Sequence, residues 1–96
     1  MRRWYIVSYD IRDPKRLNRV FRVLKGYGEH WQYSVFFCAL RDTARVRLQA
    51  DLEKEMNLKE DQAIIVDLGT RADKALESIS VVGAPLPPPD DRMLVI

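Results

Sequence analysis

The sequence predicts a small α+β domain, and three observations support this. The chain has 96 residues, which suits one domain, and 47 % of them are hydrophobic, so it can bury a core. Stretches rich in aromatic and β-branched residues indicate strands. Between them lie two stretches in which apolar residues recur at helical spacing. The core of so short a chain is thin, which favours stabilisation by a second copy.

The first element is an apolar strand that ends on a carboxylate and covers residues 5–11. Side chains alternate along a strand, and both faces are apolar enough to require burial. The two faces hold Trp4, Ile6, Ser8 and Asp10 on one side and Tyr5, Val7, Tyr9 and Ile11 on the other. A carboxylate at this position needs a cation, a hydrogen-bond donor or an open sheet edge as its partner. Asp is also a common turn former, so a plain turn is the alternative role of Asp10.

A helix is predicted over residues 14–27. Asp13 can accept a hydrogen bond from first-turn amides, and Pro14 is tolerated at the first helical position. Gly26 and Gly28 offer the left-handed residue that commonly ends a helix. The apolar side chains share one side, which we assign to the core. They are Leu17, Val20, Phe21 and Leu24.

The opposite arc of this helix is basic, and we expect no acid to neutralise its charges. It contains Arg12, Lys15, Arg16, Arg19, Arg22 and Lys25. Exposed helix faces are often Lys/Glu mixtures with internal ion pairs, so a face of one sign favours phosphate binding. Residues 1–50 hold 11 Lys and Arg against 4 Asp and Glu, whereas residues 51–96 hold 5 against 10. This asymmetry suggests one face for a polyanion, with ordinary solvated helix faces as the alternative.

Residues 30–40 form extended structure, either one bent strand or two short ones, and both alternating sets are largely apolar. His30 at the strand entrance is interpreted as structural, although acid–base chemistry and phosphate binding are alternatives. Cys38 is the single cysteine, so it forms no internal disulfide and fits a reducing, cytoplasmic location. No segment approaches the roughly 18 apolar residues of a membrane span, and no signal peptide is evident, so we expect a soluble protein.

A second helix, at the surface, is predicted over residues 42–57. Asp42 or Thr43 can cap its start, and Asn57 can end it. Its charges pair internally, as Lys54 does with its acidic neighbours, so we interpret it as a solvated face.

The next segment begins with a continuous apolar strand at residues 63–68, of the kind that is buried on both faces. Residues 70–78 are polar and predicted to be irregular. Residues 79–82 are predicted to form a short strand that ends at Gly83. Residues 1–83 are therefore expected to form the domain.

Residues 84–96 differ in character from the rest. A proline-rich spacer at 84–89 must be extended, because each Pro biases its predecessor away from the helix. The four apolar residues 93–96 would fray unless paired with a sheet edge, so we predict an extra terminal strand that pairs with a partner protomer.

This order of elements is that of a ferredoxin-like α+β domain, βαββαβ, with an extra C-terminal strand. Two helices on one face leave the other face of the sheet uncovered, so we expect a face-to-face homodimer. A twofold axis would bring two copies of Asp10 together. One carboxylate alone holds Mg²⁺ poorly, and the dimer would supply the second.

Several motifs together resemble the CRISPR-associated protein 2 family over residues 3–83. They are Tyr9-Asp10-Ile11 at the strand end, the Arg-rich helix, Gly28-x-x-x-Gln32-Tyr33-Ser34-Val35-Phe36, and Asp61 before an apolar strand. The resemblance implies a homodimer in which Asp10 of each chain coordinates Mg²⁺, or alternatively Mn²⁺, with Tyr9 beside it. It implies a CRISPR adaptation protein that is a metal-dependent endonuclease of single-stranded RNA or double-stranded DNA, with Asp10 and Tyr9 as catalytic residues.

The family's further functional positions fall on Arg19 and Phe36, and many members carry Arg where this chain has His30. The predicted nucleic-acid-binding set is Arg12, Lys15, Arg16, Arg19, Arg22 and Phe36. The alternative function that the resemblance implies is a non-catalytic scaffold in spacer integration. In that role the dimer holds prespacer DNA between dimers of the integrase, CRISPR-associated protein 1, and the partner performs the catalysis. A small-molecule sensor is a third possibility, but it leaves the basic helix face unexplained.

Overall fold

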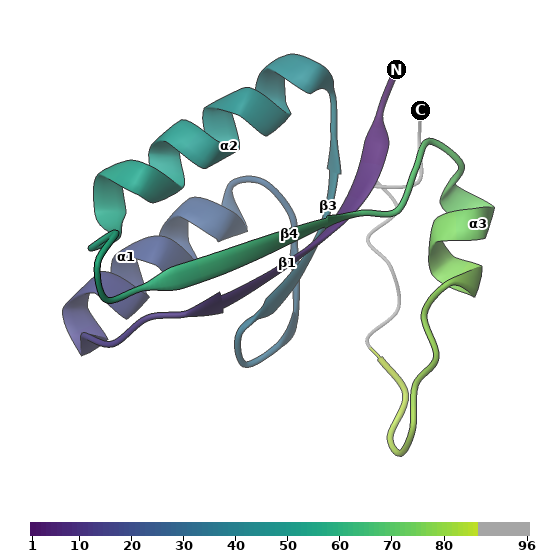
Figure 1. The fold of residues 1–96 in the computed structure, drawn as a ribbon. Helices are drawn as coiled ribbons and strands as arrows, with labels where there is room; N and C mark the ends of the chain where they lie inside the picture. The colour runs from purple at the N-terminus through teal and green to yellow at the C-terminus, as the bar shows by residue number, and fades with distance from the viewer. Residues whose placement is uncertain (87–96) are drawn as a thin grey trace.

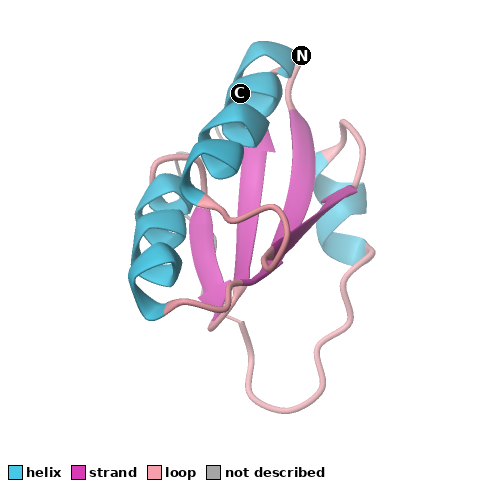
Figure 2. Ribbon diagram, turned by 60° about the vertical axis from the view of Figure 1, so that its left-hand side comes forward, coloured by secondary structure: helices cyan, strands magenta, loops and turns pink. Residues whose placement is uncertain are grey.

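The structure, a computed structural model, describes residues 1–86. A four-stranded sheet has two helices on one face and a short helix on the other (Figures 1 and 2). The strands are β1 (Arg3–Asp10), β2 (Glu29–Gln32), β3 (Val35–Leu40) and β4 (Gln62–Asp67). The helices are α1 (Pro14–Lys25), α2 (Asp42–Glu55) and α3 (Ala72–Glu77). The strand order is β2-β3-β1-β4, and all pairs are antiparallel, which confirms the ferredoxin-like prediction.

Strand β1 lies in the middle of the sheet and pairs with both β3 and β4. It begins at Arg3, two residues before the predicted start, and ends at Asp10. The predicted alternation is confirmed. Tyr5, Val7 and Tyr9 belong to the main core beneath α1 and α2, whereas Trp4 belongs to a second cluster on the opposite face.

The main core joins the sheet to α1 and α2. Val20 and Leu24 of α1 and Leu48 of α2 are completely buried, as the helical spacing of apolar residues predicts. Asp13 caps α1 as expected, because its Oδ2 accepts a hydrogen bond from the Arg16 backbone amide at 2.9 Å.

The ends of both long helices differ from the predictions. Helix α1 ends at Lys25, and Gly26 follows with φ −77°, so no left-handed residue terminates it. Gly28 is required for another reason, since a Cβ there would lie 2.4 Å from the Phe37 carbonyl oxygen. Helix α2 starts after Arg41 without a side-chain cap and ends at Glu55.

The region 30–40 forms two strands rather than one bent strand. A turn at residues 33–34 separates β2 from β3, and the pairing shifts register between His30 and Gln32. On the face opposite α1 and α2, the Trp31 and Phe37 rings stack at 4.4 Å between centroids.

The prediction that residues 70–78 are irregular is wrong, because most of them form helix α3. Helix α3 lies on the second face of the sheet (Figure 1). Its residues Ala72, Ala75 and Leu76, with Ile79 after it, pack in one cluster with Trp4 and Phe37. These four residues follow the i, i+3, i+4, i+7 spacing of an amphipathic helix. The chain therefore covers part of this face by itself.

The rest of the second face is open. Strand β4 is an edge strand whose Ile64 and Val66 are 52 % and 44 % exposed, so the prediction that it is buried on both faces is wrong for the single chain. The predicted strand at 79–82 is also wrong, because these residues form a loop in which Val82 is fully exposed. The predicted terminal strand 93–96 and the second half of the proline spacer, residues 87–89, lie outside the described residues. No helix within residues 1–86 is long and apolar enough to cross a membrane.

Candidate nucleic acid interface and metal site

Asp10 is exposed at the end of β1, on the face of the sheet that α1 and α2 leave free. It stands opposite Gln62 of β4 and helps to line a hollow of about 320 Å³. Ser8, Ser34 and Ile64 also line this hollow. The strand end thus presents a carboxylate to a small recess, the position expected for a ligand-binding acid.

Among residues 1–86, Asp10 is the only carboxylate that lines this hollow. Within residues 1–86 no three His, Cys, Asp or Glu side chains gather in a group that would hold a metal ion. Mg²⁺ nevertheless commonly binds through one or two carboxylates together with water and substrate phosphates. An exposed Asp10 fits this coordination, provided that a second carboxylate or a phosphate completes it.

Tyr9 lies next to Asp10 in sequence and borders the same hollow, but its ring belongs to the main core. The side chain is buried, and its hydroxyl donates a hydrogen bond to the Tyr33 carbonyl oxygen at 3.2 Å. Burial raises the pKa of the Tyr9 phenol. The structure therefore places Tyr9 and Asp10 on opposite faces of the sheet and gives Tyr9 a contact that fixes the β2–β3 turn.

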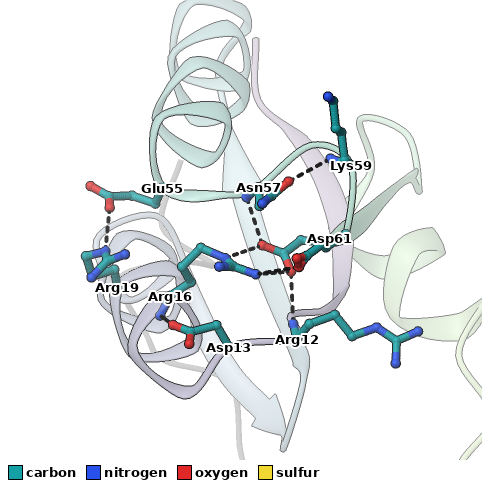
Figure 3. Close-up of polar contacts among 9 residues, drawn as sticks. Arg12, Asp13, Arg16, Arg19, Glu55, Asn57, Lys59 and Asp61 are labelled. Carbon is teal, nitrogen blue, oxygen red and sulfur yellow. Dashed lines mark hydrogen bonds and ion pairs between the residues drawn. The ribbon is translucent and has the colours of Figure 1, made fainter.

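The most extensive polar network of this region is centred on Asp61 (Figure 3). The Asp61 side chain is 0 % exposed and accepts hydrogen bonds from Arg16 Nε at 2.8 Å and Arg16 Nη2 at 3.2 Å. It also accepts from the backbone amides of Arg12 at 2.9 Å and Asn57 at 2.8 Å. Hydrogen bonding to Arg16 holds the pKa of Asp61 well below its usual range. The network ties the loop after β1, helix α1 and the loop before β4 into one unit.

The prediction that no acid neutralises the basic face of α1 is wrong, because acids from elsewhere in the chain pair with two of its arginines. Arg16 pairs with Asp61 and lies 3.8 Å from Glu60, and Arg19 Nε pairs with Glu55 at 3.0 Å. The acids come from α2 and the loop that follows it. Arg16 is therefore primarily a structural residue, and the charge of Arg19 is partly compensated.

The other basic side chains of this arc remain exposed, and none has an ion pair within residues 1–86. They are Arg12, Lys15, Arg22 and Lys25. The Lys25 ammonium lies 5.8 Å from the centroid of the Phe21 ring, in cation–π contact. Four uncompensated cations along one helix and its entry loop are a suitable surface for phosphates.

The prediction that Phe36 binds nucleic acid is also wrong. It is 0 % exposed and packs among Tyr9, Phe21 and His30, with centroid distances of 6.1, 5.5 and 5.0 Å. A ring at this depth cannot contact nucleic acid. Its role in this structure is to support the rings above it, among them His30, which is exposed.

The fold and this surface define a small ferredoxin-like α+β protein with a free carboxylate at the end of its central strand and a basic first helix. Comparison with known proteins agrees with that class. The chain belongs to the family of CRISPR associated protein Cas2, whose model matches residues 1–75. The resemblance seen in the sequence is thereby confirmed.

Individual relatives support the assignment. The chain is 42 % identical over 77 residues to "CRISPR-associated endoribonuclease Cas2 1" of Rhodospirillum rubrum, covering 78 % of this chain and 76 % of that protein. It is 36 % identical over 88 residues to the "CRISPR-associated endoribonuclease Cas2" of Geobacter sulfurreducens, covering 92 % of each. The structure of a hypothetical protein, TT1823, from Thermus thermophilus superimposes with a TM-score of 0.78 at 30 % identity, covering 94 % of this chain and 100 % of that one. Streptococcus pyogenes Cas2 shares the fold, with a TM-score of 0.71, 24 % identity and coverage of 83 % and 99 %.

Proposed function

We propose that the protein is a homodimeric, Mg²⁺-dependent endonuclease of a CRISPR system, in which Asp10 of each protomer contributes to one metal site. The observation that carries the proposal is the exposed Asp10 in its hollow on the open face of the sheet. Relatives at 42 % and 36 % identity bear the name endoribonuclease, which favours RNA as a substrate.

The open face of the sheet supports the dimer. Ile64 and Val66 are exposed on this face, and Ile64 lines the Asp10 hollow. A second copy that covers them would bury apolar surface. A cyclic dimer uses the same patch of both protomers, so a twofold axis that passes close to Asp10 would bring the two Asp10 carboxylates together. Two carboxylates, water and a substrate phosphate are the ligands that Mg²⁺ prefers, and Mn²⁺ accepts the same set.

In this proposal the basic residues bind the nucleic acid and Asp10 holds the metal ion. Arg12, Lys15, Arg22 and Lys25 would bind the phosphate backbone without reading bases, because phosphate contacts position a nucleic acid but carry no sequence information. Asp10 would orient the metal ion at the scissile phosphate. When bound, the metal would activate a water molecule and stabilise charge on the phosphate.

The test is cleavage of single-stranded RNA and double-stranded DNA by the wild type and by Asp10→Ala, with Asp42→Asn as the control. Asp42 is exposed at the start of α2, so its neutralisation tests the loss of one surface carboxylate elsewhere. We expect Asp10→Ala to abolish Mg²⁺-dependent cleavage and the control to retain it. Cleavage that survives in Asp10→Ala would contradict the proposal, as would a monomer at micromolar concentration in sedimentation.

A second candidate function is a DNA-binding scaffold for the integrase, CRISPR-associated protein 1. The specific observation in its favour concerns residues 1–86, where four basic side chains on α1 and its entry loop have no ion pair but only one acid lines the candidate metal site. In this case Asp10→Ala should leave spacer integration intact, whereas Arg12, Lys15 and Arg22 replaced by Glu should abolish it. Arg16 is unsuitable for this charge reversal, because its replacement would disrupt the Asp61 network. Integration that survives the triple reversal would refute the scaffold.

A further inference from the structure

A second hollow adjoins the one that holds Asp10. It measures about 260 Å³, and it is lined by Tyr9, Leu17, Asn18, Phe21, His30 and Tyr33. Tyr9, Leu17 and Tyr33 also line the Asp10 hollow, so the two recesses meet along these residues. We call the second recess the aromatic hollow.

Tyr33 is exposed, yet its backbone is held firmly. The residue is 80 % exposed at the β2–β3 turn, and its carbonyl oxygen accepts the hydrogen bond from the Tyr9 hydroxyl. The same oxygen lies 3.4 Å from His30 Nε2, and the Tyr9 amide donates to the Ser34 carbonyl at 3.1 Å. A large aromatic side chain thus stands at the rim of a recess, on a turn that is hydrogen-bonded to Tyr9 and His30.

Packed aromatic rings lie at and beneath the aromatic hollow. Phe21 and His30 meet edge to face at 5.0 Å, and His30 packs on the buried Phe36 at 5.0 Å. His30 itself is exposed, so it offers a ring face supported from beneath. An aromatic platform of this kind can stack with any flat conjugated ring, including all four nucleobases.

Charge and hydrogen-bonding groups flank these rings. Asn18, Arg22 and Lys25 are four and three residues apart on α1 and so share one stripe of the helix. The Lys25 ammonium lies over the Phe21 ring, as described above. Asn18 carries an amide that can both donate to and accept from the edge of a base. Cations beside aromatic faces fit a base together with its phosphate, rather than an uncharged apolar ligand.

We propose that the aromatic hollow binds one unpaired nucleobase of a single-stranded nucleic acid, stacked on Tyr33 and His30. The adjoining sugar-phosphate backbone then lies at the Asp10 hollow. The proposal rests on the proposed function in taking nucleic acid as the substrate, and it specifies that substrate as single-stranded. A duplex keeps its bases stacked and paired, so it cannot place a base in this recess.

Binding is measured without cleavage, by fluorescence anisotropy in EDTA, on the full-length protein. The probes are a single-stranded oligoadenylate RNA, a strand of the same length without bases, and an RNA duplex. We expect the wild type to bind the base-bearing strand about five- to 150-fold more tightly than the strand without bases, the range for stacking of one base. Tyr33→Ala and Tyr33→Leu should lose most of this preference, whereas Tyr33→Phe should keep it. Leu58→Ala, which removes another exposed apolar side chain, serves as the control and should bind like the wild type.

A 2-aminopurine base in the strand gives a second readout, because stacking quenches its fluorescence. We expect quenching with the wild type and with Tyr33→Phe, and none with Tyr33→Ala. Equal affinity of wild type and Tyr33→Ala, equal affinity for strands with and without bases, or tightest binding of the duplex would each overturn the proposal. If Asp10→Ala still cleaves RNA while the base preference persists, the proposed metal site fails and the base site stands. If Asp10→Ala abolishes cleavage while Tyr33→Ala binds the strand as the wild type does, the base site fails and the proposed metal site stands.

Discussion

Replacing Asp61 by Asn should destabilise the protein strongly, although Asn has nearly the same size and shape. The carboxylate accepts four hydrogen bonds, two at each oxygen, from Arg16 and from the amides of Arg12 and Asn57. Asn retains one acceptor oxygen, and its NH₂ group would face donors at the other position. Two hydrogen bonds to a charged group are worth about 3–6 kcal/mol. The Arg16 side chain is 21 % exposed and can turn to water, so we expect a loss of about 3 kcal/mol in the free energy of unfolding.

Urea and thermal unfolding followed by circular dichroism measure this loss. For a domain of this size, 3 kcal/mol lowers the midpoint of thermal unfolding by about 12–24 °C. Asp67→Asn is the matched control, because Asp67 pairs with Arg3 at 2.9 Å but both side chains are at least 40 % exposed. An exposed pair of this kind contributes about 0–1 kcal/mol. If Asp61→Asn proved no more destabilising than Asp67→Asn, the Asp61 network would not hold the fold together as described.

The same substitution should change how stability depends on pH. Hydrogen bonding to Arg16, followed by the two backbone amides, lowers the pKa of Asp61 in the folded protein below its value of about 3.9 in the unfolded chain. As the pH falls, the unfolded chain therefore takes up this proton first. The stabilisation from the carboxylate is fully present above about pH 5 and is lost progressively below about pH 4. The unfolding free energies of wild type and Asp61→Asn should converge between about pH 4 and pH 2, and parallel curves would refute the coupling.

Two further substitutions and one labelling experiment test the packing of the core. Gly28→Ala should cost about 1–3 kcal/mol in urea unfolding, because the new Cβ would lie 2.4 Å from the Phe37 carbonyl oxygen and 2.5 Å from Cys38 Sγ; wild-type stability would contradict this. Phe36→Ala should cost about 3–5 kcal/mol, since it empties a fully buried site, and a loss below about 1 kcal/mol would show that the ring is not enclosed. Burial raises the pKa of the Cys38 thiol to about 12, so this thiol should stay unreactive toward a disulfide reagent at pH 8 until urea unfolds the chain. Labelling of the native protein at the rate of a free peptide thiol would refute that.

Local patterns in the sequence were sufficient to predict most of the main fold. The alternation in β1, the Asp13 cap of α1 and the spacing of Val20 and Leu24 are properties of neighbouring residues, and the structure confirms each of them. Helix α3 was missed because it has only six residues, and two of its apolar positions are alanines in an otherwise polar stretch. Its signal was the spacing that runs from Ala72 to Ile79, which is visible once the segment is read as a helix.

The candidate site was less predictable, because its contacts depend on tertiary structure. Arg16 and Asp61 are 45 residues apart, so no local pattern shows that they pair. Alternation assigns Phe36 to one face of its strand but does not say which face the helices cover. The same holds for Tyr9, whose hydroxyl meets the β2–β3 turn, 24 residues further along the chain. Asp10 was predictable as a strand-end acid, and the structure places it on the open face.

Helix α3 bears on the shortest fragment of this chain that would remain well folded. Six residues are too few for an isolated helix to persist in water, so α3 exists only while it rests on the sheet. A fragment that stopped at Thr70 would keep every strand but lose Ala75 and Leu76, and would uncover Trp4 and Phe37. Solvent exposure of these two large rings would promote aggregation, which would interfere with any binding assay. Shortened versions of the protein should therefore extend at least to Ile79, four residues past the match to the family.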